Sequence, residues 1–138
     1  MERNMIESDY DTVHTITDWY DGPRGGVADL NGEPHYYECR WDEARGDWSE
    51  VYLLNRIDNE TFRLALEDWQ IWLRWDAAFH EGRTHHETHP ALPEDRARHN
   101  ELEKVLAERL VINPDACVKA KAEFKFGKPA LVRWSDVS

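Results

Sequence analysis

The sequence predicts an α+β fold in which an antiparallel β-meander of about four strands carries two helices packed on one face and takes back a C-terminal strand. Residues 12–57 predict the meander, because short runs of alternating apolar and polar residues are separated there by turn residues. From Asp58 the apolar residues recur every three or four positions, as in helices, and alternation returns at residues 116–126. We expect the 138 residues to form one domain, with residues 1–11 as the segment most prone to disorder.

The first strands are indicated by β-branched residues and by one turn. Residues 12–17, TVHTIT, are rich in β-branched side chains, which favour strands. Residues 25–30 and 34–41 flank Asn31-Gly32, a dipeptide that accepts the positive backbone angles of a tight hairpin. Another strand is expected at residues 50–57, after the polar segment DEARGDWS.

Two strands alternate clearly enough for their faces to be assigned. The second strand of the hairpin places four side chains on one face that we expect to be buried, namely His35, Tyr37, Cys39 and Trp41. Residues 116–126 alternate in the same way, with lysines on the opposite face that discourage edge pairing. A short last strand is expected at residues 130–134, after Pro129.

Two helices are predicted between these strands. The first begins at Asp58 or Asn59, either of which can cap a helix, and ends at Gly82, which tolerates the left-handed conformation. It carries two apolar stripes, so we expect it to be covered on two sides. The second helix begins at Pro93 and is stopped by Asn113-Pro114.

Composition narrows the classes of function. There are 28 Asp and Glu against 17 Lys and Arg, and the net charge of −11 repels nucleic acid and favours a protein partner with a basic surface. Solubility is the simpler explanation of the same charge. The two cysteines form neither a zinc-finger motif nor a disulfide framework, and no signal peptide or apolar run long enough for a membrane span is present. These features predict a cytoplasmic protein without membrane association.

The segment HEGRTHHETHP, residues 80–90, holds four histidines. It lacks the HExxH spacing of zinc hydrolases, so we interpret it as a polar loop between the helices. The alternative is a zinc site that draws its ligands from His80, His85, His86 and His89. Asp76 lies one helical turn before His80, and this pair is interpreted as structural, with an acid and base pair as the alternative.

The segment TDWYDGPRGGVAD, residues 17–29, is the leading candidate for binding. Aromatic and arginine side chains dominate recognition hot spots, and this glycine-rich loop concentrates Trp19, Tyr20, Asp21 and Arg24. Its glycines do not have the spacing of a phosphate-binding loop. An anchored turn with Trp19 in the core is the equally weighted alternative.

The phrases DWYDGPRGGVADLNGEPHYYE, AFHEG and THPALPEDRARHNEL resemble those of a set of small uncharacterised bacterial proteins that carry them in the same order. This resemblance implies a bacterial source and marks these loops as candidate sites, but it implies no activity.

The function expected from these observations is that of a small acidic binding protein, such as an inhibitor, an immunity factor or a regulatory adaptor, rather than an enzyme. No cofactor is expected. The alternative is a small metal-dependent hydrolase or isomerase that uses zinc at the histidine loop.

Overall fold

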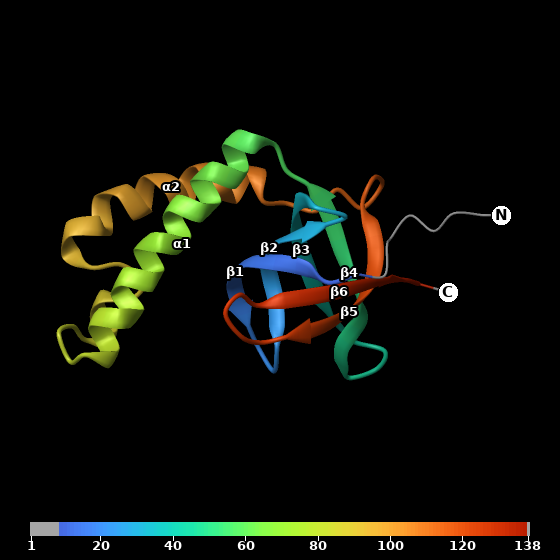
Figure 1. Ribbon diagram of the computed structural model, residues 1–138, viewed down its shortest axis with the longest axis horizontal. Helices are drawn as coiled ribbons and strands as arrows, with labels where there is room; N and C mark the ends of the chain where they lie inside the picture. Colours follow the sequence, from blue (N-terminus) through green and yellow to red (C-terminus); the bar gives the residue numbers. More distant parts are fainter. Residues whose placement is uncertain (1–8, 138) are drawn as a thin grey trace. The chain divides into compact units, whose positions relative to one another are not determined.

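The computed structural model describes residues 9–137, which form two compact units. The first unit runs through Asp58 and resumes at Val111, and the second comprises residues 59–110 (Figure 1). The disorder expected for residues 1–11 falls mostly on residues 1–8, which lie outside the described part of the chain. Asp11 is already the first residue of a strand.

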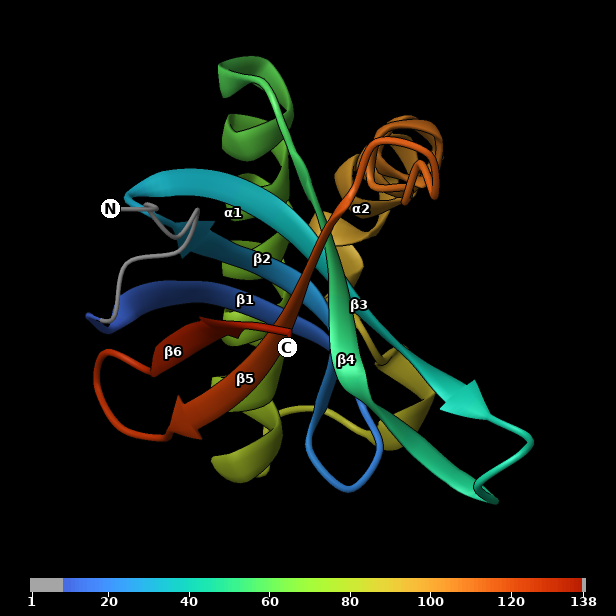
Figure 2. The ribbon, with the colours of Figure 1, turned by 90° about the vertical axis from the view of Figure 1, so that its right-hand side faces the viewer.

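The first unit is a closed antiparallel barrel of six strands (Figure 2). In chain order the strands are β1 (Asp11–Trp19), β2 (Pro23–Leu30), β3 (Glu33–Asp42), β4 (Asp47–Arg56), β5 (Val118–Lys125) and β6 (Leu131–Asp136). Each strand pairs with the next, and β6 returns to β1 through the pairs Asp11↔Val132 and Thr12↔Leu131.

The prediction of an open meander of about four strands with helices packed on one face is therefore wrong. The barrel closes through β1 and β6, which lie at opposite ends of the chain, and local alternation of apolar residues does not encode such a pairing. The two helices belong to the second compact unit.

A turn and a side-chain cap fix the hairpin between β2 and β3. Asn31 and Gly32 have φ values of 53° and 80°, which this dipeptide adopts with little strain. The carboxylate of Asp11 accepts hydrogen bonds from both backbone N–H groups at 3.1 Å. The first residue of β1 thus holds the turn that registers β2 against β3.

Aromatic rings fill the barrel interior. All six pairs among Tyr37, Tyr52, Phe124 and Trp134 have ring centroids 5.7 to 6.1 Å apart. The Tyr37 hydroxyl donates to the Thr15 carbonyl at 3.1 Å, so the polar end of this buried ring is satisfied. Burial raises the pKa of Tyr37 far above its usual value and that of Tyr52 to about 12.

One of the four residues assigned to the buried face of β3 lies outside. His35, Tyr37 and Cys39 are buried, but the Trp41 side chain is 49% exposed. Trp41 has the same parity as these residues but lies next to the hairpin turn, where β3 and β4 extend beyond the other strands (Figure 2). The register shift between Cys39 and Trp41 sets two positions of β3 against four of β4, so it leaves the alternation of β3 unchanged.

The second unit contains the helices α1 (Asn59–His80) and α2 (Arg96–Arg109), with short 3-10 helices at His86–Thr88 and Pro93–Asp95. Gly82, with φ of 75°, lies just beyond α1 as expected, whereas α2 ends before the predicted stop at Asn113-Pro114. Ion pairs join the two helices. Arg98 binds Glu67 through two nitrogens, and the largely buried His99 ring contacts Asp68 of α1 at 2.7 Å.

Gly26 in β2 provides a direct test of the close approach of β1 to β2. Its φ is +158°, and a Cβ would lie 2.2 Å from the Thr15 carbonyl oxygen and 2.7 Å from the Tyr37 hydroxyl. Gly26→Ala should therefore lower the free energy of unfolding by about 3 kcal/mol or more. Urea denaturation measures this loss. Gly127→Ala is the matched control, because the nearest atom to its Cβ is 3.8 Å away, and equal stability of the two variants would contradict the packing described.

Candidate functional site

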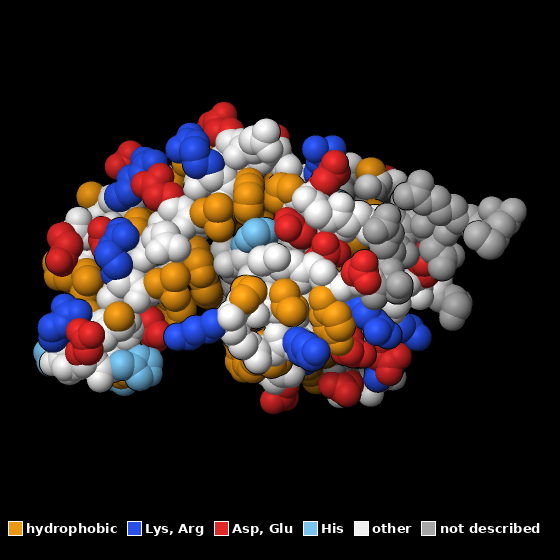
Figure 3. Space-filling view, viewed as in Figure 1, with side chains coloured by type: hydrophobic (Ala, Val, Ile, Leu, Met, Phe, Trp, Pro, Cys, Tyr) orange, Lys and Arg blue, Asp and Glu red, His pale blue; other side chains and the backbone are white. Residues whose placement is uncertain are grey.

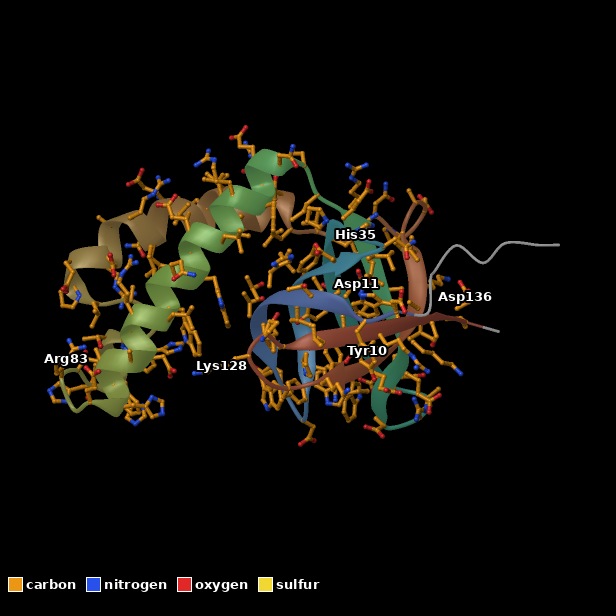
Figure 4. All side chains as sticks on the ribbon, viewed as in Figure 1. Tyr10, Asp11, His35, Arg83, Lys128 and Asp136 are labelled. Carbon is orange, nitrogen blue, oxygen red and sulfur yellow. The ribbon has the colours of Figure 1, made fainter. Side chains whose placement is uncertain are left out.

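Three hairpin loops lie at one end of the barrel, because an antiparallel meander places alternate connections at the same end. They are residues 20–22, 43–46 and 126–130, and we call this end the loop end. Figure 4 shows Lys128 of the last loop and Asp136 of β6 toward opposite ends of the barrel.

Exposed aromatic side chains gather at the loop end. The side chains of Trp19, Tyr20, Trp41 and Phe126 are 54%, 62%, 49% and 59% exposed. Together with the half-buried Trp48 they form what we call the aromatic surface. In the view of Figure 3, hydrophobic side chains gather on the lower part of the barrel beside charged ones.

The rings of the aromatic surface support one another. Trp19 packs edge-on against Phe126, with centroids 5.4 Å apart. Trp48 contacts Trp41 edge-on at 5.5 Å and stacks with Tyr20 at 6.0 Å. The exposed rings are therefore held in defined orientations by one another.

Arg24 organises the loop between β1 and β2. Its Nε donates to the Tyr20 carbonyl at 2.7 Å and its Nη2 to the Asp21 carbonyl at 2.9 Å. Its Nη1 lies 3.4 Å from both the Cys39 sulfur and the Tyr52 hydroxyl, inside the barrel. The guanidinium is thus committed to internal contacts, which makes Arg24 a positioning residue.

The same guanidinium supports the aromatic surface directly. Its central carbon lies 4.7 Å from the centroid of the Trp48 ring, in a cation–π contact. Of the four residues predicted to bind, Trp19, Tyr20 and Asp21 are exposed, and Arg24 holds the loop that presents them. The alternative that places Trp19 in the core does not fit its exposure.

Charge is distributed unevenly around the loop end. The hairpin of β3 and β4 carries Asp42, Glu43 and Asp47 near its turn, and Asp21 lies on the neighbouring loop. The loop between β5 and β6 instead carries Lys128, immediately after Gly127. The acidic side of the loop end therefore coincides with Trp41 and Tyr20.

Asp76 and His80 lie together at the end of α1 but are not buried. The His80 Nδ1–H donates to the Asp76 carbonyl at 2.8 Å and lies 3.4 Å from its carboxylate. The Asp76 side chain is 35% exposed and the His80 side chain is 72% exposed. The contact fits a helix-terminal interaction rather than a desolvated acid and base pair.

Two of the other three loop histidines pack on aromatic rings of α1. His89 lies edge-on to Trp75 at 4.6 Å, and His86 lies against Phe79 at the same distance. His85, His86 and His89 are all exposed. Within residues 9–137, no three His, Cys, Asp or Glu side chains gather in an arrangement that could hold a metal ion.

The loop between the helices is fixed by hydrogen bonds that do not involve the histidine rings. The indole of Trp75 donates to the Thr88 hydroxyl at 2.8 Å, and Arg96 donates to the carbonyls of Thr88 and Ala91. These bonds account for the ordered loop between the helices.

Comparisons of the chain with protein-family models, curated proteins and solved structures give no match. In the part of the chain that the structure describes, no helix is long and apolar enough to cross a membrane. Cys39 and Cys117 are both free thiols.

Sequence reasoning missed Trp41, Trp48 and Phe126. Each of them lies beside a turn in the sequence: Trp41 and Trp48 flank DEARGD, and Phe126 precedes Gly127. The available signal was the position of these large aromatic residues next to hairpin turns. Alternate connections of a meander lie at the same end, so aromatic residues beside those turns come together there.

The role of Arg24 can be tested by removing only its guanidinium. Arg24→Met retains much of the side-chain length but leaves two loop carbonyls and the Tyr52 hydroxyl without this donor, so we expect a loss of about 2 kcal/mol in the free energy of unfolding. Arg40→Met removes an exposed ion pair with Glu38 from β3 and should cost about 0.5 kcal/mol. Urea denaturation compares the two variants, and equal losses would show that Arg24 does not organise the loop.

Proposed function

We propose that the protein is a non-enzymatic binding protein that holds a protein partner with a basic surface through its aromatic surface. One observation carries the proposal. Of the seven exposed large hydrophobic side chains in residues 9–137, four lie at the loop end, namely Trp19, Tyr20, Trp41 and Phe126. Gathered exposed apolar side chains mark interaction sites, whereas scattered ones are ordinary.

The chemistry of these side chains supports a protein partner. Tryptophan and tyrosine offer large contact areas with few rotatable bonds, and they dominate the energetics of protein interfaces. Ring contacts and Arg24 already fix the orientations of Trp48 and Tyr20, so binding would order few additional side chains.

The charge of the chain supports a basic partner. The net charge of −11 and the acids around Trp41 would accelerate encounter with a positively charged surface and disfavour nucleic acid. An inhibitor, an immunity factor or a regulatory adaptor acts by binding another protein in this way. The two free thiols fit a reducing compartment, and we place the protein in the cytoplasm.

Capture of the partner tests this function. The tagged chain, incubated with lysate of its native cell at low salt, should retain a protein with a basic surface. Trp19→Ala combined with Trp41→Ala should weaken the affinity for that purified protein about 30-fold or more, because both exposed rings are removed. Raising the salt should weaken binding further, since exposed charges are screened.

Val111→Ala is the control for general loss of apolar surface, because Val111 is 52% exposed and lies outside the aromatic surface. Its affinity should equal that of the unmodified chain. Circular dichroism should show that all variants remain folded. A partner that binds the double tryptophan variant as tightly as the unmodified chain would overturn the proposed function.

A further inference from the structure

The outward face of β5 and β6 is positively charged, although the chain as a whole carries a net charge of −11. The inward side chains of β5 pack in the barrel core, namely Val118, Ala120, Ala122 and Phe124. Alternation directs the side chains between them outward, and it does the same for the side chain between Val132 and Trp134 of β6. Four exposed cations result, which we call the basic face: Lys119, Lys121, Lys125 and Arg133.

Protection of a free sheet edge does not account for this charge. The sequence predicts that the lysines of residues 116–126 discourage edge pairing, but β5 lies between β4 and β6 in the closed barrel. Lys119 belongs to the stretch that is paired with β4, and Arg133 lies on β6, which is paired with β5. The basic face therefore has another cause.

The cations of the basic face have no carboxylate partner within residues 9–137. The cross-strand neighbours of the three lysines are uncharged, namely Leu53, Ser135 and Leu131. Elsewhere among the described residues, seven arginines pair with carboxylates of the chain: Arg40, Arg45, Arg56, Arg74, Arg83, Arg98 and Arg109. The chain thus neutralises most of its arginines and leaves the basic face open to an external anion.

Glu123 does not neutralise the basic face. Among the described residues it is the one acid at the outward positions of β5 and β6, and it lies opposite Arg133 in the ladder. Its carboxylate accepts a hydrogen bond from the Tyr10 hydroxyl. One carboxylate, already bound in this way, stands against four cations.

The ring of Tyr10 brings two of the cations together. Tyr10 lies beside β6 (Figure 4), with the Lys125 ammonium 5.0 Å and the central carbon of the Arg133 guanidinium 5.9 Å from its ring centroid. Two positive charges from neighbouring strands are thereby held over one ring. An anion that binds between them would relieve their mutual repulsion.

We infer that the basic face binds an extended acidic segment of a protein partner. This inference goes beyond the proposed function, because the basic face lies on the outward side of β5 and β6 and not on the aromatic surface. Lys119 and Lys121 are two residues apart on a strand, or about 7 Å, which is also the spacing of alternate side chains in an extended peptide. The row from Lys119 to Lys125 extends about 20 Å and matches about seven extended residues.

The size of the basic face favours an acidic segment over nucleic acid. A short peptide can place all its carboxylates within about 20 Å, whereas a longer phosphate backbone would continue beyond the face. There it would meet the negative field that the net charge of −11 creates. The acidic segment therefore needs to be short and locally dense in charge.

The probe for this inference is the acetylated and amidated peptide Glu-Ser-Glu-Ser-Glu-Ser-Glu, compared with the same peptide carrying glutamine in place of glutamate. Backbone amide signals of the full chain are followed by NMR at about 20 mM salt, with peptide up to about 5 mM, because exposed ion pairs are individually weak. The glutamate peptide should give saturable shifts in β5 and β6. The glutamine peptide should bind at least tenfold more weakly.

Substituted cations separate the basic face from the general field. Lys119→Gln, Lys121→Gln and Lys125→Gln together should weaken binding of the glutamate peptide about fivefold or more. The control combines Arg56→Gln, Arg83→Gln and Arg109→Gln, which removes the same amount of charge from exposed arginines that are already paired. It should change binding less than twofold, and circular dichroism should show that both variants remain folded.

No saturable shift in β5 and β6, or equal loss in the two triple variants, would overturn the inference. Tighter binding of an oligothymidylate of about eight nucleotides would assign the basic face to nucleic acid instead. Self-association in sedimentation experiments that the lysine variant abolishes would assign it to a second copy of this chain. Either result would overturn the acidic partner, and neither bears on capture through Trp19 and Trp41, which tests the proposed function separately.

Discussion

The guanidinium of Arg24 connects the interior of the barrel with its loop end. Inside, it lies beside the Cys39 sulfur and the Tyr52 hydroxyl, and outside it holds the carbonyls of Tyr20 and Asp21. Because it also lies over Trp48, one side chain sets the positions of two adjacent hairpins. The positions of Trp48 and of the Tyr20 backbone therefore depend on this one guanidinium.

The chain uses aromatic residues in two physically separate ways. In the barrel interior, Tyr37 and Trp134 are fully buried and their polar groups donate to the carbonyls of Thr15 and Asp29. At the loop end, Trp41 lies next to a hairpin turn and is 49% exposed, so the preference for a filled core does not explain its size. An exposed tryptophan adds little to the core, and the proposed binding role offers a reason for its presence at this end.

The sequence predicts the turns and helix ends of the fold better than it predicts the pairing that closes the barrel. Asn31-Gly32 marks a hairpin because few dipeptides accept its backbone angles, and Gly82 marks a helix end for the same reason. The pairing of Asp11 with Val132 depends instead on the sum of strand twists and offsets around six strands, which no single segment carries.

The candidate site was accessible to sequence reasoning only in part. Trp19 and Tyr20 are neighbours on one glycine-rich loop, so their concentration is visible in the sequence. Trp41 and Phe126 join them only because three hairpin loops of a meander lie at one end. Alternation along β3 placed Trp41 on the buried face, but the hairpin extends beyond the other strands at this position, and local alternation does not show where the barrel ends.

Hydroxyl-radical footprinting of the chain, alone and in complex with its captured partner, tests the central claim that the aromatic surface is the docking site. Alone, Trp19, Tyr20, Trp41 and Phe126 should be oxidised rapidly, whereas Trp134, which is 1% exposed, should react slowly. In the complex, the four exposed rings should be protected together. A complex in which these rings keep their oxidation rates while another part of the chain is protected would contradict the account.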